Sequence, residues 1–361
     1  MEKSSTLSPF LQICGIIIKT IIIKEIEKSV VCVELTINET GVTQVVTNVL
    51  TGQSVNIPPN FLYPSFLCPA RIGPTYKSVL AAINHRCHLN DKPIIIRRGS
   101  ALGDVVMSLS ALSTFNSRIH PTNPTLVSAA TDYHTICSRL NDGRKAFLLS
   151  HLGSKSEYAL GVTFDGVFEH DLVHFQGANR IDIATEILLG TDAVKHTFYL
   201  KKLKSICALV ENIFQEKKVP QKKYTIGVVL DGISNRIGSG LANAIVDKLS
   251  GIKDSVVISL GNDFGYRRAI SVGDKFKPEH LFELVDRCSV LVTVDSAMYW
   301  ISHYTETPTV LLLNGNLELS PGSKTKYHKD TVPIIADFTD SNARTLAKAV
   351  TAEVRKVLKR G

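Results

Sequence analysis

Short apolar runs that alternate with amphipathic stretches predict most of the strands and helices of this chain. The apolar runs predict buried strands at residues 93–97, 145–149, 224–230, 255–260, 290–294 and 309–313. Apolar positions three and four residues apart predict helices at residues 105–115, 179–189, 205–214, 241–249, 278–287, 299–304 and 343–358. Strands that alternate with helices in this order favour parallel sheets, so the predicted fold class is α/β.

The first 90 residues have a different pattern, which is typical of antiparallel β-structure. The apolar run at 10–23 predicts a strand, and residues 30–37 alternate between apolar and polar side chains. A turn-forming Asn38-Glu-Thr-Gly cluster then leads into a second strand at 42–50. Five prolines between 58 and 74 predict an irregular connector. We therefore expect a β-rich N-terminal extension.

These patterns predict two Rossmann-like domains joined by a basic linker. We place the extension at 1–90, an N-terminal Rossmann-like domain that binds the acceptor at 91–200, the linker at 201–223 and a C-terminal Rossmann-like domain at 224–361. Residues 195–224 contain eight lysines and two glutamates, a local charge of +6. This segment is either a solvated hinge or a contact for a phosphate-rich partner.

Composition excludes several classes of protein and favours an anionic partner. With 44% hydrophobic and 20% charged residues in 361, the chain is neither disordered nor fibrous. A net charge of +8 suits a nucleotide, a phosphorylated glycan, nucleic acid or an acidic membrane surface. Seven cysteines without CxxC spacing argue against disulfides and zinc. No apolar stretch reaches the length of a membrane span, so we expect a cytoplasmic protein without an integral membrane segment.

The first of three strand-to-helix junctions with candidate chemistry is Arg98-Gly-Ser-Ala-Leu-Gly-Asp104. Small residues such as Ser100 and Gly103 let the backbone come close to a ligand. Asp104 falls where a helix begins. It is either a helix N-cap or a carboxylate that removes a proton from an attacking hydroxyl.

The second junction is Leu230-Asp-Gly-Ile-Ser-Asn-Arg-Ile-Gly-Ser-Gly240, which also follows a strand and opens a helix. The free amides of a helix N-terminus suit a diphosphate, here with Gly238 and Gly240 in the loop. Arg236 could neutralise the charge of a leaving group. The alternative is a flexible loop that binds nothing, because the glycines do not follow the dinucleotide pattern.

The third junction follows the apolar run 290–294 and contains Asp295 and Ser296. These residues either cap the next helix or contact a ligand beyond the strand end. Trp300 and His303 follow on that helix. We expect His303 to be packed in the core and Trp300 to line the core or a cleft.

The three junctions, in this order, resemble the heptosyltransferases that build the lipopolysaccharide inner core. Residues 94–112 resemble the family's opening strand, Ser-x-Leu-Gly-Asp turn and first helix. Residues 284–313 resemble its Asp-[Ser/Thr]-Gly-x-x-His signature and the Thr-Pro-x-Val-x-Leu strand that follows. The likeness extends over about residues 93–320. Ala297 replaces the signature glycine and Trp300 the signature histidine.

The resemblance implies the GT-B fold and inverting, metal-independent glycosyl transfer, with Asp104 as the catalytic base. The co-substrate would be a nucleotide-diphosphate sugar, with no further cofactor. Either Asn235 or Arg236 takes the family's basic position, and Phe276 falls where the family packs an apolar side chain on the nucleotide base. The donor site would comprise Ser234, Asn235, Gly238, Gly240, Phe276, Asp295, Ser296 and Ala297, and the acceptor-side loop Arg98, Ser100 and Gly103.

Three functions follow from these observations. The leading hypothesis is a glycosyltransferase that moves a hexosyl, heptosyl or pentosyl group to a glycan of the lipopolysaccharide-core type. The second is a glycosyltransferase for a hydroxylated base of modified DNA, which the basic linker and the altered donor signature favour. The third is a catalytically degenerate binding module that has kept the fold.

Overall fold

The computed structural model divides the chain into two compact units. Unit 1 comprises Met1–Ser100 and Ser108–Thr197, and unit 2 comprises Ala101–Met107 and Phe198–Gly361. Each unit is described by itself below. The structure describes residues 21–23, 31–38, 41–48, 54–57, 61–62, 94–98, 102–119, 126–129, 133–140, 146–148, 160–163, 180–189, 196, 198–231, 237–261, 265–315 and 331–360.

An antiparallel sheet begins unit 1, as the alternating pattern predicts. Its four strands, in spatial order, are β1 (Ile21–Ile23), β2 (Val31–Asn38), β3 (Gly41–Asn48) and β4 (Ser54–Ile57). Strands β2 and β3 pair along their whole length, from Val31 opposite Asn48 to Asn38 opposite Gly41. Two residues therefore connect them, which matches the turn predicted at Asn38-Glu-Thr-Gly.

The second sheet of unit 1 is parallel, and helices alternate with several of its strands along the chain. Its strand order is β5-β9-β6-β7-β8, and α2, α3 and α5 lie between or after these strands in the chain. Strands β5, β7 and β9 and helix α3 were not among the predicted elements. The bounds are β5 Phe61–Leu62, β6 Ile94–Arg98, β7 Leu126–Ala129, β8 Ala146–Leu148, β9 Leu160–Thr163, α2 Leu102–Ile119, α3 His134–Leu140 and α5 Arg180–Leu189.

Unit 2 is built on a six-stranded sheet in which every neighbouring pair is parallel. The strand order is β12-β11-β10-β13-β14-β15, so the chain starts in the middle of the sheet and builds outward in both directions. The strands are β10 Tyr224–Val229, β11 Ser255–Ser259, β12 Ile270–Ser271, β13 Val290–Val294, β14 Thr309–Asn314 and β15 Thr331–Ala336.

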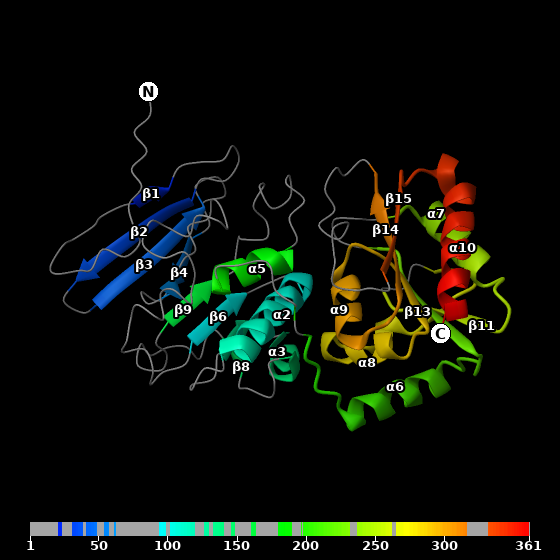
Figure 1. The fold of residues 1–361 in the computed structure, drawn as a ribbon, viewed down its shortest axis with the longest axis horizontal. Coiled ribbons are helices and arrows are strands. Elements are labelled where there is room, and N and C mark those ends of the chain that lie inside the picture. Colours follow the sequence, from blue (N-terminus) through cyan, green and yellow to red (C-terminus); the bar gives the residue numbers. More distant parts are fainter. Residues whose placement is uncertain are drawn as a thin grey trace. The chain divides into compact units, whose positions relative to one another are not determined.

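Helices cover both faces of this sheet (Figure 1). Alternate residues of β13, namely Val290, Val292 and Val294, pack in an apolar core with α7 and α10. Their neighbours Leu291 and Thr293 face the opposite side, where α8 and α9 lie. The predicted α/β class is thus confirmed. The helices of unit 2 are α6 Lys204–Glu216, α7 Ser239–Leu249, α8 Leu281–Asp286, α9 Ala297–Thr305 and α10 Ala343–Arg360.

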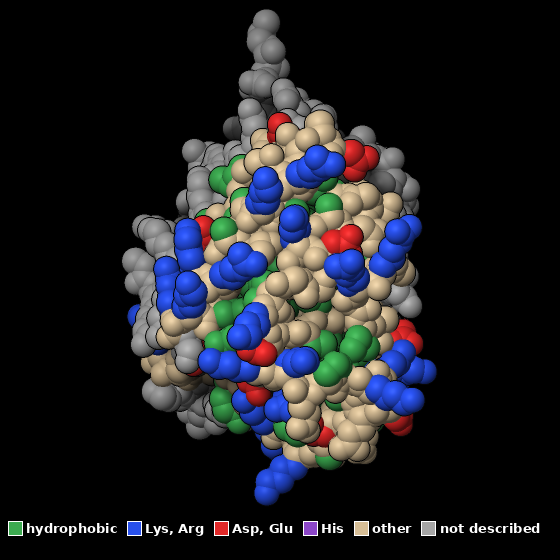
Figure 2. Space-filling model, turned by 90° about the vertical axis from the view of Figure 1, so that its right-hand side faces the viewer, with side chains coloured by type: hydrophobic (Ala, Val, Ile, Leu, Met, Phe, Trp, Pro, Cys, Tyr) green, Lys and Arg blue, Asp and Glu red, His purple; other side chains and the backbone are tan. Residues whose placement is uncertain are grey.

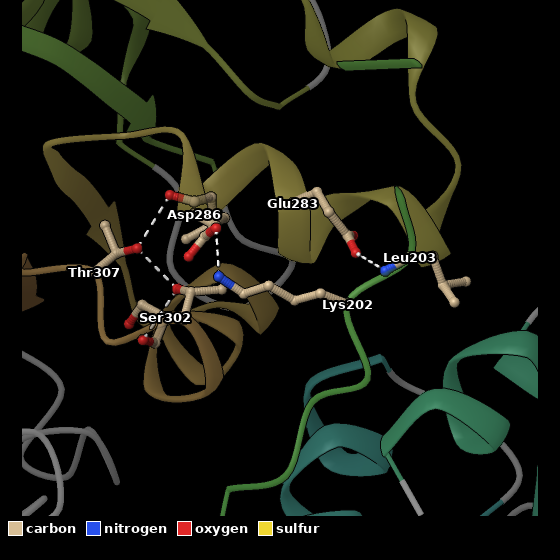
Figure 3. A network of polar contacts seen from close by, with 8 residues as sticks. Lys202, Leu203, Glu283, Asp286, Ser302 and Thr307 are labelled. Carbon is tan, nitrogen blue, oxygen red and sulfur yellow. Dashed lines mark hydrogen bonds and ion pairs between the residues drawn. The ribbon is translucent and has the colours of Figure 1, made fainter. Parts of the chain in front are cut away.

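The segment that leads into α6 is bound to unit 2. The Lys202 ammonium lies 2.7 Å from an Asp286 carboxylate oxygen, and the Leu203 amide donates a hydrogen bond to Glu283 over 3.3 Å (Figure 3). Glu283 is only 2% exposed, so this bond satisfies a buried carboxylate oxygen. The second and longer part of unit 2 begins at Phe198, ahead of the segment predicted as a linker.

Candidate active site

Two aspartates follow neighbouring strands at the carboxyl edge of the six-stranded sheet. Val229 of β10 pairs with Thr293 of β13, and Asp231 and Asp295 each come two residues later. Asp295 is 8% exposed. A Cβ placed on Gly261 would lie 2.8 Å from an Asp231 carboxylate oxygen, so Asp231 leans toward the end of β11. The carboxyl edge is where open parallel sheets bind ligands.

Of the two roles considered for Ser296, a helix cap or a ligand contact, the structure does not show the side-chain cap. Ser296 occupies the N-cap position of α9 in an extended conformation, but its side chain makes no capping hydrogen bond. The Thr293 hydroxyl donates to the Val294 carbonyl over 2.9 Å, so the Ser296 hydroxyl donates to Thr293 over 3.1 Å. The Ser296 side chain therefore does not cap α9, while the Tyr299 amide in the first turn donates to the Ser296 carbonyl over 3.1 Å.

The first turns of α2 cluster with unit 2 and lie against the start of α9. A Cβ placed on Gly103 would be 3.5 Å from Ala297 Cα and 3.5 Å from Trp300 Cδ1. Asp104, the next residue, is 7% exposed. Because α2 begins at Leu102, Asp104 lies inside the first turn and not at the N-cap. The structure thus brings the predicted base into the same compact unit as Asp295.

Helix α7 begins at the predicted glycine loop. Gly238 is the N-cap and Gly240 lies in the first turn, so the helix starts two residues earlier than predicted. A Cβ on Gly240 would lie 3.0 Å from an Asp340 carboxylate oxygen. A carboxylate near a helix N-terminus is stabilised by the partial positive charge there. It also occupies space beside the amides that the sequence assigns to a diphosphate.

Phe276 is held near the end of β11 by a glycine that the sequence analysis missed. A Cβ on Gly273 would lie 2.3 Å from the Gly261 carbonyl oxygen, so only glycine fits there. The Val272 amide donates to the Ser259 carbonyl over 3.1 Å and keeps this segment on the strand end. Half-buried Phe276 follows, with its ring edge-on to His280. A glycine five residues before a proline gives no sequence signal for such a contact.

Part of the predicted site lies outside the residues that the structure describes. This holds for Ser100, Ser234, Asn235 and Arg236. Arg98 is the last residue of β6 and thus at the carboxyl end of its strand, but its side chain is not described. The roles assigned to these residues stay predictions.

Helix α9, which begins at the candidate site, carries a cluster of buried aromatic side chains. Trp300 is 2% and His303 4% exposed, and their rings stack at 5.5 Å. The His303 Nδ1 lies 3.0 Å from the Tyr299 carbonyl oxygen of its own helix. Both residues therefore occupy the packed positions that the sequence predicts.

Burial makes two thiols poor nucleophiles. It raises the pKa of Cys137 and of Cys288 to about 12, so both remain protonated at neutral pH. In the described part of the chain no three His, Cys, Asp or Glu side chains gather as a metal site would require. None of the helices described there has the length and apolar character needed to cross a bilayer.

The fold is that of solved glycosyltransferases. A glycosyl transferase family 9 structure from Veillonella parvula DSM 2008 is 11% identical over 76% of this chain and 99% of its own, with a TM-score of 0.62. The ADP-heptose lps heptosyltransferase II of E. coli is 12% identical over 74% of this chain and 99% of its own, with a TM-score of 0.58. The likeness confirms, at the level of the fold, the predicted GT-B class and the resemblance to heptosyltransferases.

A third structure is the dodecameric iron-containing heptosyltransferase TibC in complex with ADP-D-β-D-heptose. It is 14% identical over 75% of this chain and 79% of its own, with a TM-score of 0.54. No family model and no curated protein sequence matches this chain. The common ground with these enzymes is therefore the fold.

Proposed function

We propose that this protein is an inverting glycosyltransferase that uses a nucleotide-diphosphate sugar. The observation that carries the proposal is the contact between the starts of α2 and α9. Through this contact Asp104 lies in one compact unit with Asp295 and with the start of α9, which the Ser296 side chain does not cap. The shared fold with sugar-nucleotide-dependent enzymes supports it.

In this proposal the donor lies along the carboxyl edge of the six-stranded sheet. Phe276 packs on the nucleotide base, and the amides at Gly238 and Gly240 bind the diphosphate with Arg236. Asp295 accepts hydrogen bonds from hydroxyls of the sugar, and the first amides of α9, beside Ser296 and Ala297, contact the phosphates. Two of these elements are helix N-termini, which stabilise the negative charge that develops on a departing diphosphate.

The chemical step is a single in-line displacement. The acceptor oxygen attacks the anomeric carbon as the bond from that carbon to the diphosphate oxygen breaks, and the electron pair leaves with the nucleoside diphosphate. Asp104 takes the proton of the attacking hydroxyl, which makes the oxygen a stronger nucleophile. Attack opposite to the leaving group inverts the anomeric centre. The charge of the leaving group is balanced by amides and Arg236, so the step requires no metal.

The acceptor we propose is a phosphorylated glycan of the lipopolysaccharide-core type. The second candidate is a hydroxylated base in DNA, favoured by the basic exposed face of α10 in unit 2. The two are separated by supplying a labelled donor with either a core glycan or duplex DNA that contains hydroxymethylated bases. Label in only one of them identifies the acceptor class.

The first test is thermal stabilisation by a panel of nucleotide sugars and nucleoside diphosphates. A ligand at 100 times its Kd adds about 2.7 kcal/mol to the unfolding free energy, which is easily detected. We expect one donor to stabilise the protein and Asp295→Ala to weaken that effect. Asp247→Ala, a change at an exposed position in the last turn of α7, is the matched control and should leave donor binding unchanged.

Asp104→Asn separates binding from chemistry in the same assay. It should keep donor binding within about twofold and lower transfer by about 10²–10⁴-fold, the usual contribution of a general base. Full transfer activity in this variant would show that Asp104 is not the general base. If no donor in the panel stabilises the wild type, the degenerate binding module becomes the preferred explanation.

A further inference from the structure

We propose that Tyr304 is a positioning residue that holds Asp104 in place for the transfer reaction. The inference rests on the proposed function, because Asp104 acts there as the base. Tyr304 lies near the end of α9, 6% exposed, and does not itself belong to the predicted donor site. It acts through the backbone of α2.

The contact is a buried hydrogen bond between segments far apart in sequence. The Tyr304 hydroxyl donates to the Val106 carbonyl oxygen over 2.8 Å, and the two residues are 198 positions apart. Val106 is itself fully buried. Water cannot easily replace a lost partner at such a place, so the bond constrains where the first turns of α2 lie.

A second contact constrains the other side of the same turn. Gly103 lies against Ala297 and Trp300 at the start of α9. Gly103 precedes Asp104 and Val106 follows it, so the two contacts flank the carboxylate in the chain. A helix turn that is fixed on both sides of one residue leaves that residue little freedom to shift.

The ring of Tyr304 is fixed by two further aromatic side chains. It meets the Phe198 ring edge-on at 5.2 Å and the Phe282 ring edge-on at 5.8 Å. These rings come from the segment before α6 and from α8. The hydroxyl of Tyr304 therefore has one orientation available, which points at α2.

A shift of a catalytic group by about 1 Å can cost about a hundredfold in rate. Tyr304→Phe removes only the hydroxyl and keeps the ring packed against Phe198 and Phe282. We expect kcat for transfer to fall about tenfold, while the donor KM and the thermal shift by the nucleoside diphosphate stay within about twofold. A lower kcat with unchanged KM and thermal shift distinguishes positioning of the base from a general loss of structure.

Ser302→Ala is the matched control. The Ser302 hydroxyl is also fully buried on α9, but it donates to the Tyr299 carbonyl of the same helix over 2.6 Å. This variant loses one buried hydroxyl without touching α2. It should lower the melting temperature by about as much as Tyr304→Phe and keep kcat within twofold.

Hydrogen exchange gives a readout that does not depend on activity. In Tyr304→Phe, amides of residues 105–108 should exchange faster than in the wild type, and those of residues 111–117 should not. An equal fall of kcat in both variants, or unchanged exchange at 105–108, would overturn the inference. Failure of the proposed function is distinguishable, because the wild type would then neither bind a donor nor transfer a sugar.

Discussion

At the scale of single residues, one carboxylate lies at the start of α7, where we propose that a diphosphate binds. Exposed Asp340 lies against Gly240, where a Cβ would be 3.0 Å from its oxygen. The negative charge stabilises the free end of the helix. A diphosphate at the same end would bring further negative charge close to it, and like charges repel. Asp340 should therefore weaken donor binding while it stabilises the free protein.

Asp340→Asn tests whether Asp340 weakens donor binding while it stabilises the protein without ligand. We expect the variant to bind the nucleoside diphosphate that the panel identifies about two- to fivefold more tightly, the effect of one exposed charge. Its melting temperature without ligand should fall slightly, because a favourable charge at the helix end is lost. Calorimetric titration with ADP, GDP, UDP and CDP measures the affinity.

Asp247→Asn removes the same charge near the other end of α7 and is the control for affinity. It should leave the Kd within error of the wild type. Weaker binding by Asp340→Asn would instead mean that Asp340 contacts the ligand favourably, for example through a hydroxyl of the sugar.

At the scale of elements, a single close contact sets where the segment with Phe276 lies. Gly273 approaches the backbone of Leu260 and Gly261 so closely that an added Cβ would be 2.4 Å and 2.3 Å from their carbonyl oxygens. Backbone atoms at a strand end cannot move aside as a flexible side chain can. The short strand β12 and the turn that follows it depend on this glycine.

We expect Gly273→Ala to lower the free energy of unfolding by about 1–3 kcal/mol, the usual cost of overpacking. Urea denaturation measures this loss. Gly251→Ala is the control, because its Cβ would lie 3.4 Å from the nearest atom, the Lys248 carbonyl oxygen. That variant should be unchanged or more stable by about 0.4–1 kcal/mol. Similar stability of both variants would contradict the close contact at Gly273.

Hydrophobic patterning finds the central elements of unit 2 but not its edges. The buried strands β10, β11, β13 and β14 are short, mostly apolar runs, because both faces of a parallel sheet are covered. Strand β15 is an edge strand with Ile335 67% exposed and a proline at 333, so its pattern resembles a loop. Strand β12 has two residues and no pattern of its own. The positions of β12 and β15 are fixed by pairing with β11 and β14, respectively.

At the scale of the whole molecule, the excess of basic residues is visible on one face of unit 2. Figure 2 shows the side that carries α10, on which Lys and Arg side chains outnumber Asp and Glu. Helix α10 has one acidic residue, Glu353, whose carboxylate pairs with Lys356. Such a face attracts polyanions. Its exposed basic residues on α10 are Arg344, Lys348, Arg355, Lys356, Lys359 and Arg360.

Lys359→Glu should weaken the binding of duplex DNA, used here as a polyanion probe. Fluorescence anisotropy at several salt concentrations should give a slope of log K against log salt that is smaller by about one than in the wild type. Lys204→Glu makes the same charge change on α6 and should have a smaller effect. Equal effects of both variants would show that net charge alone, and not this face, attracts the probe.

The sequence by itself determined the α/β class, the central strands and the positions of Asp104 and Asp295 after their strands, because these depend on local apolar patterns and on chain order. It could not place Asp340 beside Gly240, or Gly273 against Gly261. Only the tertiary structure decided that the first turns of α2 belong to unit 2 and that Tyr304 bonds to Val106. The reason is physical: such contacts join segments up to about 200 residues apart, and no local periodicity encodes which distant backbone will meet a given side chain.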